Sequence, residues 1–234
     1  ILVGEKPTRN GGGGGSFVTD NTNNPLIIAG GGGGSGTDDD SPNKHANITI
    51  TGGTGSGGGG AGGTAGNGGV IGASFASGAG GGLLTDGQDG WTTNTGGKAF
   101  INGGVGGNAG FGIGGFGGGG NGSGNAVGGG GGGYSGVGAA SNSLGSGGVG
   151  GGGASFNVGS NQNNTGGINT GHGKVIIYGN NNLTITQTEG LPMGSTFPIG
   201  TTTNKFIVTD ASGNISDTCS FTVTVVDNEA PTAT

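Results

Sequence analysis

The sequence predicts an all-β protein whose largest region is held together mainly by its own backbone. Of its 72 glycines, 66 lie within residues 11–173, about 40 % of that stretch against a usual share of roughly 7 %. Short β-branched and aromatic runs interrupt the glycines. Between residues 46 and 173 only Asp86, Asp89 and Lys98 carry a charge, whereas disordered chains are typically highly charged. These observations favour an ordered region without an ordinary side-chain core.

The glycines run consecutively over residues 11–15, 30–34, 117–120 and 128–133. A collagen triple helix is excluded, because collagen requires glycine at every third position and many prolines. The remaining ordered structure is a set of extended helices with three residues per turn. Glycine lets such helices pack closely enough to pair their backbone groups with one another. We therefore expect a bundle of polyglycine-II-type helices. A disordered glycine-rich linker is the open alternative.

Five short runs inside this region have the composition of β-strands and are expected to hold the ends of the glycine segments. They cover residues 25–29, 48–51, 99–101, 155–158 and 174–178.

A resemblance to a known family follows from several motifs in order along the chain. Residues 1–4 (Ile-Leu-Val-Gly), 25–33, 115–120, 128–134, 139–142 and 171–175 resemble the glycine-rich extracellular region of the anaplastic lymphoma kinase and leukocyte tyrosine kinase receptors. That resemblance implies an extracellular ligand-binding module in which polyglycine-type helices are inserted into a TNF-like jelly roll. The receptor regions contain cysteines, whereas residues 1–218 here contain none, and nothing indicates a kinase.

The last fifty residues differ in composition from the glycine-rich region. The alternating run at 183–188, the stretches at 194–203 and 206–214, and a final run at 219–227 are typical of a partial immunoglobulin-like β-sandwich. The amino-acid sequence of this region resembles the second half of the hyalin repeat (HYR), an extracellular adhesion module. The expected domains are thus residues 1–178, residues 179–229, and a short junction at 230–234. The hyalin resemblance implies a disulfide from Cys219 to a partner outside this sequence, and a free thiol is the alternative.

Charge and composition exclude several function classes. The net charge of −6 with only 6 Lys and Arg argues against nucleic-acid binding. The sequence contains no run of 18 apolar residues, the length that a membrane-spanning helix needs. The two histidines, His45 and His172, have no metal-ligand spacing around them. The sequence predicts no catalytic residues and no cofactor.

Two polar stretches are candidate sites. Asp86 and Asp89 flank a turn that leads to Trp91, the only tryptophan, and aromatic side chains on loops often anchor sugar or protein contacts. A tryptophan that covers one end of the glycine bundle is the alternative. Asp38, Asp39 and Asp40 are weak candidates for Ca²⁺, against a solvated acidic loop.

The sequence therefore predicts a non-catalytic binding or adhesion module of a secreted or cell-surface protein. Its ligand would be an extracellular glycan or protein, bound through loops on a rigid scaffold. The competing interpretation is an accessory region of a secreted enzyme whose catalytic domain lies outside this sequence.

Overall fold

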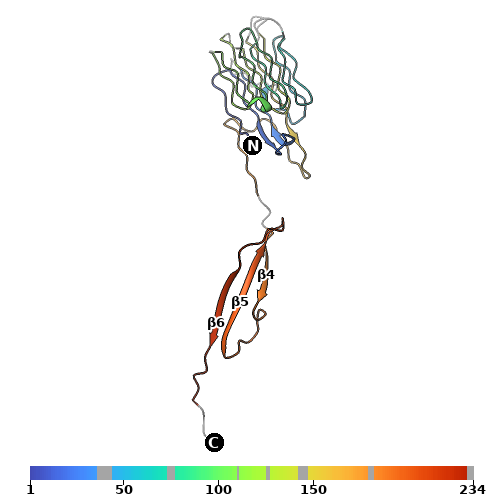
Figure 1. Cartoon of the computed structure of the whole chain (residues 1–234). Helices are drawn as coiled ribbons and strands as arrows, with labels where there is room; N and C mark the ends of the chain where they lie inside the picture. Colours follow the sequence, from blue (N-terminus) through green and yellow to red (C-terminus); the bar gives the residue numbers. More distant parts are fainter. Residues whose placement is uncertain are drawn as a thin grey trace. The chain divides into compact units, whose positions relative to one another are not determined.

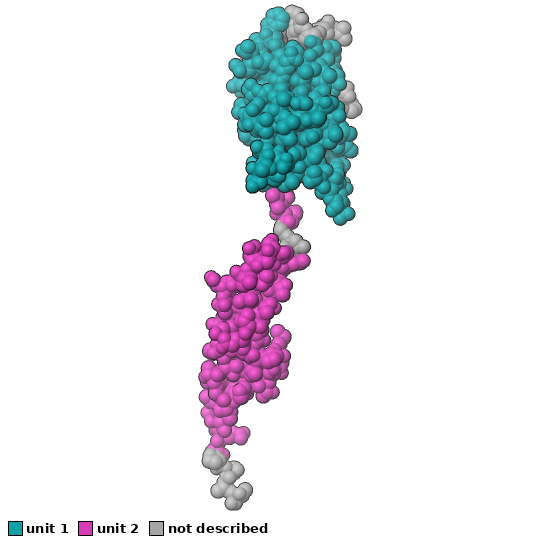
Figure 2. Space-filling view, turned by 45° about the vertical axis from the view of Figure 1, so that its right-hand side comes forward, with its two compact units in different colours: residues 1–175 teal, residues 176–234 magenta. Residues whose placement is uncertain are grey.

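The computed structural model describes residues 1–35, 44–72, 77–109, 111–124, 127–141, 147–178 and 182–230. The chain divides into two compact units, Ile1–Val175 and Ile176–Thr234 (Figure 2). Each unit contains one three-stranded antiparallel sheet, and over the described ranges the only helix with assigned bounds is a single 3₁₀ turn, Phe100–Asn102. The prediction of an all-β protein is confirmed. None of the described helices is long and apolar enough to cross a bilayer.

The sheet of unit 1 is formed by β1 (Ser16–Thr19), β2 (Pro25–Ala29) and β3 (Phe156–Asn157), in that order. Its register places Phe17 opposite Ile28 and Ile28 opposite Phe156, so these three side chains form a row on one face. Phe17 and Ile28 are each 1 % exposed and cluster with buried Leu83. This small apolar cluster is the side-chain core of unit 1.

Aromatic rings from the glycine-rich segments complete this core. The Phe100 ring stacks on Phe17 with centroids 5.0 Å apart, and the Tyr134 ring stacks on Phe156 at 4.6 Å. Each of these rings stands where a glycine segment reaches the sheet. The sheet therefore fixes the ends of segments that have almost no side chains of their own.

The long segments of unit 1 run side by side (Figure 1), and residues 128–133 show how they are joined. Six consecutive N–H groups donate to three different neighbours, and every third residue returns to the same neighbour. The donor–acceptor pairs are Gly128–Gly148 (2.8 Å), Gly129–Asn10 (2.9 Å), Gly130–Gly78 (3.0 Å), Gly131–Gly151 (3.1 Å), Gly132–Gly13 (2.9 Å) and Gly133–Gly81 (3.3 Å). A β-strand would instead alternate between two neighbours.

The same period of three recurs in other glycine segments. Gly12 and Gly15 donate to Gly120 and Gly117, the corresponding positions of one antiparallel neighbour. In residues 150–154, donors three apart again share a neighbour: the pairs are Gly150–Gly34, Gly153–Gly31, Gly151–Gly138 and Ala154–Ser135. Buried backbone groups must find hydrogen-bond partners, and here neighbouring segments supply them.

The close approach of these segments explains why the runs are glycine. A Cβ placed on Gly131 would overlap the carbonyl oxygen of Gly31, and one on Gly119 would overlap that of Gly12. Both obstacles are backbone atoms of a neighbouring segment, which cannot rotate away as a side-chain tip can. Alanine is therefore excluded from these positions by space, independently of its backbone preferences.

Three of the five strand runs predicted within residues 1–178 turn out differently. Residues 99–101 were predicted as a strand, but Phe100–Asn102 forms η2, which ends at Gly103 (φ 93°) so that Phe100 can reach the core. Residues 48–51 bend instead of pairing along their length, with an isolated bridge only at Asn47. Residues 174–178 are not in a strand, and no neighbouring strand pairs with them in the described structure.

The sheet of unit 2 comprises β4 (Thr184–Glu189), β5 (Gly200–Thr209) and β6 (Cys219–Val225), in sequence order. The register divides it into an apolar and a hydroxyl-rich face. The apolar face carries Ile185, Phe206, Val208, Phe221, Val223 and Val225, with Phe206 and Phe221 stacked at 5.9 Å. Threonines dominate the other face. One-sided sheets of this kind are the building blocks of an immunoglobulin-like sandwich.

Both units use the same hairpin turn. In unit 1 the Asp20 carboxylate accepts hydrogen bonds from the N–H of Thr22 and of Asn24, and from the Asn24 side chain. In unit 2 Asp210 accepts the equivalent three bonds from Ser212 and Asn214. The hydrogen bonds from Asn24 and Thr22 lower the pKa of Asp20 to about 2, and those from Asn214 lower the pKa of Asp210.

These turns predict a loss of stability in acid. A carboxylate whose pKa is lower in the folded than in the unfolded state stabilises the fold above its unfolded value near 4, and that contribution disappears as the pH falls toward 2. We expect the melting temperature of unit 1 to fall over this window, and Asp20→Asn to flatten the fall. Calorimetry from pH 7 to pH 2 measures it, with Glu5→Gln as the control carboxylate. An Asp20→Asn protein that melts with an unchanged pH dependence would contradict the prediction.

Candidate functional site

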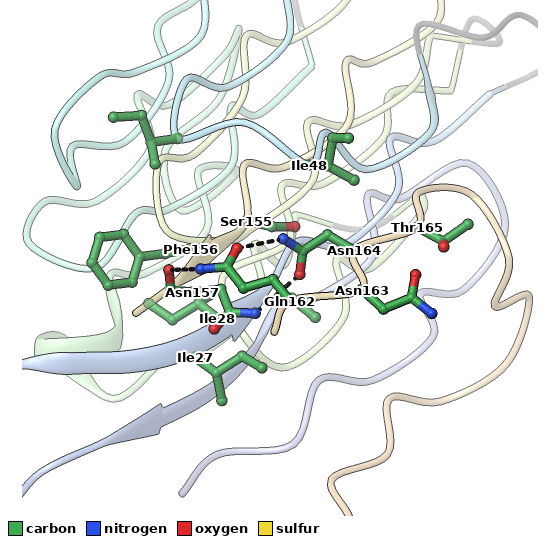
Figure 3. A pocket seen from close by; sticks show the side chains of 12 residues that line it. Ile27, Ile28, Ile48, Ser155, Phe156, Asn157, Gln162, Asn163, Asn164 and Thr165 are labelled. Carbon is green, nitrogen blue, oxygen red and sulfur yellow. Dashed lines mark hydrogen bonds between the residues drawn. The ribbon is translucent and has the colours of Figure 1, made fainter. Parts of the chain in front are cut away.

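A pocket of about 320 Å³ opens beside the sheet of unit 1. Three distant stretches form it: strand β2, the bend at residues 48–50, and the segment from 155 to 165 that contains β3 (Figure 3). One wall is aliphatic, with Ile27, Ile48 and Ile50 each about half exposed. Ile27 points here because it pairs with Asn157 on the face of the sheet opposite to the core.

The other wall is a chain of three side-chain amides, which Figure 3 shows lying against one another. Asn157 Nδ2 donates to Asn164 Oδ1 (3.0 Å), and Asn164 Nδ2 donates to Gln162 Oε1 (2.8 Å). Gln162 Nε2 in turn donates to the carbonyl oxygens of Asn157 (2.9 Å) and Gly159 (2.8 Å). The amides are thereby fixed in orientation, and none of the residues that line the pocket carries a formal charge.

The predicted residue Trp91 lies on a tight turn elsewhere in unit 1, with 68 % of its surface exposed. Thr95 closes the turn: its Oγ1 accepts from the Gly90 N–H (2.6 Å) and donates to the carbonyl of Thr92 (2.9 Å). Asn94 adopts a positive φ of 63° at the corner. Trp91 is thus presented on a turn of defined shape, while the pocket is built from other residues.

The carboxylates predicted beside Trp91 have structural partners. Asp89 accepts a hydrogen bond from the Gly96 N–H (2.8 Å) across the base of the turn. Asp86 forms an ion pair with Lys98 (2.9 Å) and accepts bonds from the Ala99 N–H and the Asn102 side chain (both 2.8 Å). Burial raises the pKa of Asp86, but these hydrogen bonds outweigh it and hold the pKa below the ordinary value.

A second exposed aromatic residue, Phe111, follows a segment that is hydrogen-bonded to the Trp91 turn. The Asn108 N–H donates to the carbonyl of Asn94 (2.8 Å), which joins the Trp91 turn to the segment leading to Phe111. Phe111 is 61 % exposed, and its ring lies over the backbone of Gly124. Sequence reasoning missed Phe111 because a single phenylalanine among glycines gave no signal for exposure.

The remaining predicted site residues are three consecutive aspartates and Cys219. Asp38, Asp39 and Asp40 lie outside the described residues. Within the residues that are described, no three His, Cys, Asp or Glu side chains gather as a metal site would require. Cys219 is an exposed free thiol on β6, and its disulfide to a partner outside this sequence stays a prediction.

The pocket was missed for a different reason. Its aliphatic wall falls within runs that were read only as strands, at residues 25–29 and 48–51, and its amides lie in an asparagine-rich loop of ordinary composition. No spacing in the sequence connects these stretches, because the pairing of β2 with β3 brings residues about 130 positions apart together.

Comparison with known protein families matches the C-terminal part of the chain. No curated protein and no solved structure matches. Residues 172–225 match the HYR domain family, in agreement with the hyalin resemblance seen in the sequence. This region includes all of β4, β5 and β6. Residues 172–225 are therefore similar to a domain of the extracellular, adhesion type.

Proposed function

We propose that this chain is a non-catalytic adhesion module of a secreted or cell-surface protein, in which a rigid glycine-rich unit presents the ligand-binding loops. The match of residues 172–225 to the HYR domain is the observation that carries the adhesion assignment. HYR domains occur in extracellular and cell-surface proteins and are not catalytic.

The rigidity of unit 1 is the second part of the proposal. We infer that its glycine segments are polyglycine-II-type helices, since their hydrogen bonds recur every third residue as in a helix with three residues per turn. Such a bundle has few side chains to rearrange. It is an appropriate scaffold for recognition, because rigid frameworks commonly carry binding residues on their loops.

The receptor-like resemblance of residues 1–178 supports the same role. In that family the glycine-rich region binds an extracellular ligand. Here Trp91 and Phe111 are exposed, and a hydrogen bond from the Asn108 N–H to the Asn94 carbonyl joins the Trp91 turn to the segment before Phe111. Large aromatic side chains bury much area at little entropic cost and dominate many interfaces. We propose that these two aromatic residues contact an extracellular glycan or protein.

Binding of the full chain to a glycan array and to intact cells tests this function. Trp91→Ala and Phe111→Ala are each expected to weaken binding at least tenfold, since an aromatic anchor contributes about 2 kcal/mol or more. Ile101→Ala, which truncates an exposed side chain of the same unit, serves as the matched control. Hydrolysis of the bound glycan, or binding insensitive to both aromatic substitutions, would contradict the proposal.

A further inference from the structure

We propose that the pocket beside β2 and β3 binds a neutral saccharide unit that carries an acetyl or methyl group. This rests on the proposed function, a binding module, and assigns it a second site that does not involve Trp91. The volume of about 320 Å³ is at the lower end of the range for small-molecule sites, about 300–1,000 Å³. The pocket therefore accommodates a single small ring better than a long chain.

The amide wall defines the polar part of the ligand. Each side-chain amide has two donor hydrogens and two acceptor lone pairs. Asn157 Oδ1 also accepts a hydrogen bond from the Gly159 N–H (2.8 Å), so Asn157 and Asn164 each use one Nδ2 hydrogen and one acceptor position of Oδ1. Each of these two amides thus keeps one N–H and one acceptor position that these bonds do not use. Hydroxyl and acetamido groups, which donate and accept at once, match such a surface.

The absence of charge in the lining defines the ligand further. The residues around this pocket are isoleucine, alanine, phenylalanine, serine, threonine, asparagine and glutamine. A carboxylate, phosphate or ammonium group would enter it without a countercharge and lose its hydration, which is unfavourable. The pocket therefore selects neutral ligands.

The aliphatic wall distinguishes among neutral sugars. The flat face of a sugar ring packs best on the flat face of an aromatic ring, but Phe156 is occupied by its stack with Tyr134. The exposed apolar surface consists of the branched side chains of Ile27, Ile48 and Ile50. Methyl groups fit among branched aliphatic side chains, and burial of a methyl group is worth about 0.8 kcal/mol. An N-acetyl or 6-deoxy sugar provides such a methyl group, whereas glucose does not.

Saturation-transfer NMR of the full chain with N-acetylglucosamine, fucose and glucose as probes tests this assignment. We expect N-acetylglucosamine or fucose to bind at least fivefold more tightly than glucose, with the strongest transfer at the methyl protons. The side-chain NH₂ signals of Asn157, Gln162 and Asn164 should shift on titration. These readouts use the unaltered protein.

Substitutions then locate the site. Ile48→Ala and Gln162→Ala should each weaken binding at least fivefold, while Ile101→Ala, at an isoleucine of similar exposure in the same unit, should leave it unchanged. Equal binding of glucose, transfer without shifts of the amide signals, or no transfer from any probe would overturn the pocket assignment. The proposed function would survive each of these results if the chain still bound cells through Trp91, and would fail separately if it did not.

Discussion

Replacing Gly131 by alanine is expected to destabilise unit 1 by about 3 kcal/mol or more. The new Cβ would overlap the carbonyl oxygen of Gly31 and press against the N–H of Gly153. Both atoms belong to the backbone of neighbouring segments, so relief requires the segments to move apart and to lose hydrogen bonds. Gly119→Ala is expected to behave similarly, since its Cβ would overlap the carbonyl of Gly12.

The direction of the change in unfolding free energy distinguishes a closely packed bundle from an ordinary helix or strand. In an ordinary helix or strand, glycine to alanine stabilises by roughly 0.5–1 kcal/mol, because glycine loses more entropy on folding. Gly171→Ala is the matched control: the nearest atom to its Cβ is Asn169 Oδ1 at 3.6 Å, an ordinary contact. Denaturant unfolding, followed by Trp91 fluorescence, should show a large loss for Gly131→Ala and none for Gly171→Ala. Equal stability of the two variants would contradict close packing of the glycine segments.

Truncating Phe17 to alanine is expected to cost unit 1 about 3–5 kcal/mol. Phe17 is 1 % exposed, pairs with Ile28 across β1 and β2, and stacks on Phe100. Because the core cluster is small, its loss should release the ends of the glycine segments as well as the sheet. The melting temperature of unit 1 should therefore fall sharply.

Leu26→Ala is the control for Phe17→Ala. Leu26 lies on the paired strand β2 but is 42 % exposed, so its truncation should cost less than about 1 kcal/mol. A Phe17→Ala protein as stable as Leu26→Ala would show that the strands do not anchor the bundle, and that the glycine segments hold together by backbone pairing alone.

Sequence reasoning succeeded where a segment's composition alone determines its structure. The run at residues 25–29 forms β2, and the alternating run at 183–188 corresponds to β4. Residues 219–227 contain β6. In each case β-branched or aromatic residues stand between turn residues, and the partner strand is close in sequence.

It failed where tertiary contacts outweigh local preference. Residues 99–101 are of types that favour β-strands, yet they lie at a 3₁₀ turn. In this turn Phe100 stacks on Phe17 in the core, and Gly103 ends the turn with a positive φ. Strand β1 was not predicted, because Ser16–Thr19 is only four residues long and follows a glycine run directly. Its partner Pro25–Ala29 and the packing of Phe17 determine it.

The candidate sites likewise include features that local composition predicts and features that only tertiary contacts determine. Trp91 lies exposed on a turn, as its place among turn residues suggests, and its role in binding stays a prediction. The roles of Asp86 and Asp89 in closing that region depend on partners such as Lys98 and the Gly96 N–H, and only the folded chain brings them within reach. The pocket depends on three separate stretches, so no local pattern could predict it.

Amide hydrogen exchange at residues 128–133 tests most directly the claim that the glycine segments form a packed, hydrogen-bonded bundle. Each of these six consecutive N–H groups donates to a neighbouring segment at 2.8–3.3 Å. We expect all six to exchange about a thousandfold or more slowly than a random coil, as buried cooperative units do. Exchange at random-coil rates across these residues would contradict the account and leave unit 1 a disordered glycine-rich linker.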